Sequence, residues 1–200
     1  MINFPVQVYT QRLVKHKLDV YVPIIHGLTN ATAQYRINTS IMQSVNKMIQ
    51  NQGYDENPDT EVSGYYEIKN NQRGILSLTL VNYAYSGGAH GITVTKGLTF
   101  DTQTGKKYKL KELFNADSDY VKVLSDIVGK QIKDRDLPLI SEYKGISPDQ
   151  DFYIADKSLV LFFQLYDLTP YVYGFPFFPI SVYEIQPIIK EDGPLGEMIG

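Results

Sequence analysis

The chain has 200 residues, of which 43% are hydrophobic and 20% are charged, and it contains no cysteine. This composition is that of a globular protein and excludes a disordered, collagenous or coiled-coil chain. The net charge of −3 provides no basic surface for nucleic acid or an anionic membrane, and the lack of cysteine excludes thiol catalysis and thiolate-bound metals.

The first quarter of the sequence predicts two strands and a helix. Residues 6–25 contain two runs rich in Val, Ile and Tyr, which suit strands. Thr29 or Asn30 is a suitable N-cap for a helix that ends at Gly53. Apolar residues recur along this helix at three- and four-residue spacing, at Ile37, Ile41, Val45, Met48 and Ile49. The polar segment 54–60 is expected to be a surface loop.

Residues 62–100 change to a two-residue alternation, which predicts a meander of strands. Leu76, Leu78 and Leu80 share one face, with Ser77 and Thr79 opposite. Three turns are predicted, at Asn70, Asn71 and Gly74, at Ser86 to Gly91, and at Asp101 to Gly105. Because the connections are short, we expect antiparallel pairing.

A second helix and a hairpin are predicted in the second half of the chain. Asp117 or Ser118 is a suitable cap, and the helix ends before Pro138. Its apolar face consists of Val121, Leu124, Val128 and Ile132. The runs FYIA and LVLFF, with a turn at Asp156 and Lys157 between them, predict a hairpin whose second strand is central because it is apolar on both faces.

The last part of the chain is expected to be irregular. Prolines in residues 166–179 argue against sheet pairing, and residues 182–189 are expected to form a short closing helix. The predicted fold class is α+β: an antiparallel sheet of meander and hairpins, with two main helices packed on it and a short C-terminal helix. The halves 1–85 and 86–200 are expected to form one compact unit.

The glycine-rich run Ser86 to Gly91 is a candidate functional feature. Its glycines stand between two strands rather than at a helix start, so a turn with positive φ is favoured over a phosphate-binding loop. Six positions are predicted to serve turn geometry: Gly87, Gly88, Gly91, Asp101, Gly105 and Gly174. If the run Ser86 to Gly91 is such a turn, His90 is expected to be a structural hydrogen-bonding side chain. No metal site is predicted, because the three histidines are dispersed in the sequence.

The most suggestive binding feature is a concentration of tyrosine and phenylalanine near the C-terminus. Rings beside prolines that cannot pair in a sheet are expected to leave an exposed apolar patch. The candidate ligand-binding residues are Tyr171, Tyr173, Phe175, Phe177 and Phe178, together with His90.

Three segments carry a resemblance to a known family: NYAYSGGAHG at 82–91, LTFDTQTGKKYKLKELF at 98–114 and FQLYDLTPYVYGFPFFPISVYEI at 163–185. Together they resemble the RsiV family, which comprises the extracytoplasmic domain of a lysozyme-sensing anti-sigma factor and regions associated with PdaC-type deacetylases. The resemblance implies a non-enzymatic α+β recognition module at the cell envelope, with no cofactor and with a lysozyme-like protein or peptidoglycan as partner.

Two other functions are open at this point. The first is a hydrolase or transferase, or an accessory domain of one, acting on cell-wall sugars, with Asp101 or Asp167 near His90 as acid or base. The second is a soluble intracellular relative, because the chain opens on a strand pattern rather than a signal peptide. An extracytoplasmic location follows from the resemblance, and a cytoplasmic one follows if Met1 is the native start.

Overall fold

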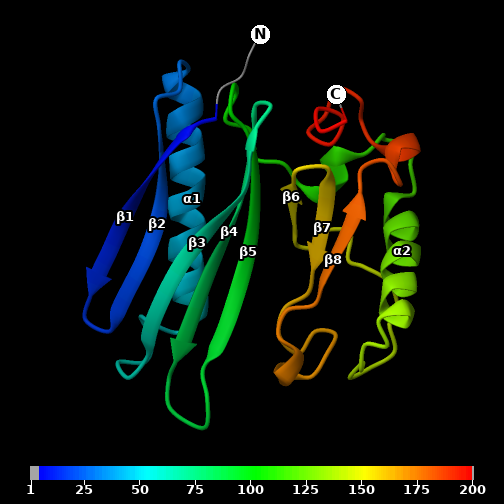
Figure 1. Ribbon diagram of the computed structural model, residues 1–200. Helices are drawn as coiled ribbons and strands as arrows, with labels where there is room; N and C mark the ends of the chain where they lie inside the picture. Colours follow the sequence, from blue (N-terminus) through cyan, green and yellow to red (C-terminus); the bar gives the residue numbers. More distant parts are fainter. Residues whose placement is uncertain (1–4, 200) are drawn as a thin grey trace. The chain divides into compact units, whose positions relative to one another are not determined.

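The computed structural model describes residues 5–199, and it divides into two compact units, one ending at Lys107 and the other beginning at Tyr108. Each unit contains a sheet and a helix (Figure 1), which confirms the α+β class. The predicted boundary between the two halves, after Tyr85, falls in the turn between the strands at residues 75–85 and 92–101. These two strands pair with each other, and both belong to the first unit.

The first unit is a five-stranded sheet with one long helix on one face (Figure 1). The strands lie in sequence order across the sheet. The elements are β1 (Gln7–Lys15), β2 (Leu18–His26), α1 (Ala31–Asn51), β3 (Glu61–Gln72), β4 (Ile75–Tyr85) and β5 (Ile92–Asp101).

The expectation of a purely antiparallel sheet is wrong at one pair. β2 and β3 run parallel, with Leu18 opposite Val62 and Val20 opposite Gly64. The reason is that α1 is a crossover connection: it returns the chain to the end of the sheet from which β2 started, so β3 begins beside the beginning of β2. All other neighbouring strands of this sheet pair antiparallel.

Helix α1 confirms the predicted cap and apolar stripe. Asn30 is the N-cap, and its Oδ1 accepts hydrogen bonds from the backbone N–H groups of Thr32 and Ala33 at 3.0 and 3.2 Å. Gly53, with φ of 78°, follows the helix in the left-handed region that favours glycine. The five stripe residues are buried, and they form one core with the inner face of the sheet.

The first turn of the meander differs from the prediction. Asn70 and Asn71 belong to β3, where the register shifts at a bulge between Ile68 and Asn70. The turn is made by Arg73 and Gly74, with φ of 56° and 74°. Asn70 is instead a buried side chain whose amide donates to the carbonyl of Ile75 at 2.7 Å.

The second unit is a three-stranded antiparallel sheet, with strand order β6-β7-β8, accompanied by α2 (Figure 1). Its elements are η1 (Leu110–Leu113), α2 (Tyr120–Asp134), β6 (Phe152–Ala155), β7 (Ser158–Phe162), η2 (Tyr171–Tyr173), β8 (Phe177–Ser181) and η3 (Gln186–Ile188). The predicted hairpin and the central position of its second strand are confirmed.

Two local predictions for this unit are corrected. The cap of α2 is Asp119, whose Oδ1 accepts from the N–H of Lys122 at 3.1 Å, rather than Asp117 or Ser118. The expected helix over 182–189 is only the single 3₁₀ turn η3.

The expectation that prolines keep residues 166–179 out of a sheet holds for residues 166–176 but is wrong for residues 177–179. Pro179 lies within β8, opposite Val160. A proline is tolerated there because β8 is an edge strand, where a missing N–H costs no ladder hydrogen bond when it faces outward.

Candidate functional site

The segment 164–174 forms a loop held by local hydrogen bonds. The N–H of Asp167 donates to the carbonyl of Gln164 at 3.2 Å, and the Asp167 carboxylate accepts from the N–H of Gln164 at 3.2 Å. Of the two residues between them, Tyr166 has a φ of 67°, a conformation that bulky side chains seldom adopt. The chain is therefore bent sharply at an exposed tyrosine.

The tip of this loop presents apolar side chains to solvent. The single turn η2 is closed by a hydrogen bond from Tyr173 N–H to the Pro170 carbonyl at 3.0 Å, and it ends at Gly174, with φ of 65°. The rings of Tyr166 and Tyr171 lie 5.5 Å apart and tilted by 32°. The exposed fractions are 84% for Val172, 55% for Tyr173 and 46% for Tyr166. We call Tyr166, Tyr171, Val172 and Tyr173 the aromatic loop.

Two of the predicted phenylalanines, Phe175 just before β8 and Phe177 at its start, continue from the loop into a cluster of rings. Phe177 is 37% exposed, and its ring centroid lies 6.5 Å from that of Phe175. Two further rings complete the cluster, Phe162 at 5.8 Å and Tyr153 at 6.1 Å from Phe177. Phe177 therefore packs against three other rings while part of it stays exposed.

Phe178, the last predicted aromatic contact, has a different environment. It is fully buried on the opposite face of the same sheet. Its ring packs edge-on against Phe163 at 5.7 Å, and the guanidinium of Arg135 lies 5.2 Å from its centre. The ring belongs to the core of the second unit and forms no part of its exposed aromatic surface.

The glycine-rich run lies in the first unit, in the exposed turn between β4 and β5. Gly87 and Gly88 have φ of 96° and 93°, as the turn interpretation requires. Gly91 is buried against Tyr83, whose hydroxyl accepts from the Gly91 N–H at 3.1 Å. His90 is exposed, and its Nδ1 lies 3.0 Å from the Gly91 carbonyl.

The turn after β5 uses Asp101 and Gly105 as structural residues. The Asp101 carboxylate accepts from the N–H groups of Gln103 and Thr104, both at 2.8 Å. Gly105 has a φ of 73°, and a Cβ there would lie 2.7 Å from the Ala33 carbonyl, so the turn approaches the start of α1 closely.

The two carboxylates named as a possible acid or base each accept hydrogen bonds from nearby backbone N–H groups. Asp101 is occupied by its turn, and Asp167, in the second unit, by the N–H of Gln164. In the second unit, burial raises the pKa of Tyr143 to about 12, which moves it away from neutrality. Within residues 5–199, no three His, Asp or Glu side chains gather as metal ligands would.

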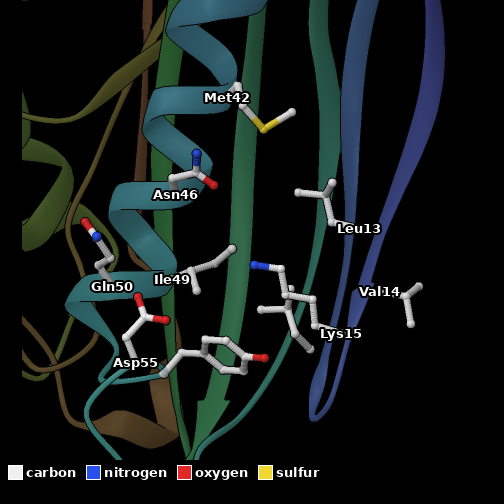
Figure 2. A pocket seen from close by; sticks show the side chains of 10 residues that line it. Leu13, Val14, Lys15, Met42, Asn46, Ile49, Gln50 and Asp55 are labelled. Atoms are coloured by element: carbon white, nitrogen blue, oxygen red, sulfur yellow. The ribbon is translucent and has the colours of Figure 1, made fainter.

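Sequence reasoning missed a groove in the first unit, between β1 and the C-terminal half of α1. Figure 2 shows Leu13 and Lys15 pointing toward the helix and Val14 pointing away from it. The groove has a volume of about 420 Å³, and its apolar floor includes Met42 and Ile49. Its existence depends on how far α1 stands from the sheet, and no local sequence pattern reports that distance.

The two halves of the chain match two family models. Residues 11–93 match the model described as deacetylase PdaC, and residues 111–183 match a protein family of unknown function, DUF3298. The peptidoglycan-N-acetylmuramic acid deacetylase PdaC of Bacillus subtilis is 26% identical over 140 residues, 66% of this chain. The chain spans only 30% of the length of that relative.

Solved structures agree with these matches at the level of the fold. A DUF3298 protein from Bacteroides fragilis superposes with a TM-score of 0.69 at 14% identity, covering 98% of this chain and 97% of that one. A DUF3298 protein from Pseudomonas aeruginosa gives 0.66 at 14% identity, covering 94% and 95%. The chain has the DUF3298 fold. Among the residues that the structure describes, no helix has the length and hydropathy to cross a membrane.

Proposed function

We propose that this chain is a non-catalytic recognition module that binds cell-wall glycan through the aromatic loop. The observation that carries the proposal is the exposure of Val172 and Tyr173, at 84% and 55%, on a loop whose conformation is fixed by its own hydrogen bonds. Apolar side chains held in this way lose little conformational freedom when a ligand binds.

Tyrosine suits a sugar ligand for physical reasons. Its ring supplies a large rigid contact for the apolar face of a pyranose, and its hydroxyl can bond the ring substituents. The inclined rings of Tyr166 and Tyr171 and the neighbouring Tyr173 provide such contacts on one loop. The B. subtilis relative is named as a peptidoglycan deacetylase, which supports peptidoglycan as the glycan.

The test is co-sedimentation of the purified chain with insoluble peptidoglycan at physiological salt. We expect saturable binding that falls at least about fivefold in Tyr173→Ala, the effect of losing one aromatic anchor. Tyr35→Ala is the matched control, since Tyr35 is a 72% exposed tyrosine on α1 in the other unit. Equal loss in both variants, or no binding by the unmodified chain, would contradict the proposal.

Two further arms separate the alternatives. Incubation with peptidoglycan should release no acetate and no reducing ends; release by the unmodified chain would show an enzyme instead. A titration with lysozyme should be weak and abolished by salt, because a net charge of −3 attracts a basic protein without specificity. Tight, salt-resistant lysozyme binding without glycan binding would identify a protein receptor and overturn the glycan proposal.

A further inference from the structure

The outer edge of β1 carries a row of backbone groups available to a partner. β1 is the first strand of the five-stranded sheet and pairs on one side only, with β2. Within residues 5–199, the backbone of its other side makes no hydrogen bond to protein. The strand has nine residues, and Tyr9 and Val14 are 59% and 60% exposed. Such an edge is a template for an added strand.

The edge strand β8 of the second sheet is protected against pairing with another strand, whereas the edge of β1 is not protected in these ways. β8 contains Pro179, which cannot donate to a ladder. Its carbonyls are also capped by α2: Gln131 Nε2 donates to Pro179 O at 2.7 Å, and an Arg135 guanidinium N–H donates to Phe177 O at 2.8 Å. β1 has no internal proline, and no helix side chain among residues 5–199 caps its outer edge.

The groove between β1 and α1 lies on one side of β1. Its lining determines which side chains a strand paired with β1 could place there. Leu13 and Lys15 face the groove, while Val14 faces away (Figure 2). Residues directly opposite one another on paired strands share a face. A partner residue opposite Leu13 would therefore contact the apolar floor at Met42 and Ile49, and one opposite Lys15 would lie beside its ammonium group.

We propose that the β1 edge binds an extended peptide, which adds as a sixth, antiparallel strand. The peptide carries an acidic residue opposite Lys15, an apolar residue opposite Val14 and an apolar residue opposite Leu13. Backbone hydrogen bonds supply the part of the affinity that does not depend on the peptide sequence, and these three side chains supply the specificity. The site lies in the first unit and does not depend on the aromatic loop.

Charge favours a separate peptide over a second copy of the chain. Lys15 forms no ion pair with any residue that the structure describes. If two β1 strands paired antiparallel about their midpoint, Gln11, each Lys15 would lie opposite a Gln7 and its charge would stay unmatched. A carboxylate on the partner matches it.

The test uses the full chain and a fluorescein-labelled octapeptide, Thr-Thr-Glu-Val-Leu-Thr-Val-Thr, followed by fluorescence polarisation. Three peptides are compared: the parent, the same peptide with Lys in place of Glu, and the parent N-methylated at alternate residues, which removes strand hydrogen bonds. Lys15→Glu is the variant, and Lys47→Glu, an exposed lysine of α1 outside the groove, is the matched control.

We expect saturable binding of the parent peptide and loss of binding on N-methylation. Lys15→Glu should weaken the parent peptide about two- to fivefold and strengthen the Lys peptide by a similar factor, as expected for a cross-strand charge pair. Lys47→Glu should change neither. The proposal is overturned if the N-methylated peptide binds as well as the parent, or if Lys15→Glu does not reverse the preference between the Glu and Lys peptides. It is also overturned if no peptide binds at millimolar concentration, or if sedimentation shows that the chain dimerises through β1.

Discussion

Asn38 joins helix α1 to strand β2 by two hydrogen bonds, and its removal tests the packing of the first unit. The N–H of Ile25 donates to Asn38 Oδ1 at 2.7 Å, and Asn38 Nδ2 donates to the Ile25 carbonyl at 2.9 Å. Ile25 is fully buried. Asn38→Ala therefore removes both bonds and leaves a donor and an acceptor of a buried residue without partners.

The expected loss follows from these two bonds. A lost hydrogen bond that leaves a buried group unsatisfied costs about 1–3 kcal/mol, so Asn38→Ala should lower the free energy of unfolding by about 2–4 kcal/mol. For a unit of roughly 100 residues, each kcal/mol lowers Tm by about 4–8 °C. The decrease in Tm should therefore be at least about 8 °C.

The measurement is guanidinium and thermal unfolding followed by far-ultraviolet circular dichroism. Asn46→Ala is the matched control, because Asn46 lies exposed on the same helix and makes no hydrogen bond through its side chain to the described residues. It should be neutral or slightly stabilising, since alanine is the better helix former. If the two variants unfold within about 0.5 kcal/mol of each other, the bridge between α1 and β2 does not contribute as argued.

Three further predictions concern the second unit and the surface charges. Phe178→Ala should lower the free energy of unfolding by about 3–5 kcal/mol, as for any buried phenylalanine, whereas Val172→Ala should change it by less than about 0.5 kcal/mol. Similar free energies of unfolding for the two variants would refute the core assignment. Burial raises the pKa of Tyr143 from 10.0 to about 12. The contribution of the protonated Tyr143 to stability is therefore complete below pH 10 and is lost as pH rises toward 12. Tyr143→Phe should flatten the dependence of the free energy of unfolding on pH between 10 and 12. Hydrogen bonding to Arg12 lowers the pKa of Asp19 below 3.8, so the contribution of this exposed pair to stability is complete above pH 3.8 and is lost as pH falls through the lowered pKa. Arg12→Gln should return the Asp19 pKa, read by NMR titration, to its ordinary value.

Local features of the fold were predictable because their causes are local. The N-cap Asn30, the stripe of α1 and Gly53 act within a few residues of one another, and the sequence places all three. The same holds for the β6–β7 hairpin, whose turn at Asp156 has a φ of 47°. Periodicity and capping suffice where each residue's partner is a neighbour in the chain.

The features that were mispredicted depend on distant partners. Parallel pairing of β2 with β3 follows from where α1 delivers the chain, which the strand patterns do not encode. Pro179 argued against a strand until its place at the sheet edge was known. Phe177 and Phe178 are adjacent and chemically identical, yet one is a surface ring and the other a core ring, because successive strand residues face opposite sides and only the packed sheet decides which side is covered.

The two proposed binding surfaces can be tested independently because they use different chemistry in different units. The aromatic loop offers side-chain rings to a glycan, and its affinity should be insensitive to a charge change at Lys15. The β1 edge offers backbone groups to a peptide, and its affinity should be insensitive to Tyr173→Ala. If either substitution weakened the binding of both ligands while leaving the unfolding transition unchanged, the two sites would be energetically coupled. Coupling of that kind requires the affinity of each ligand to change by the same factor when the other is bound, and a titration of the chain with both ligands together measures that factor.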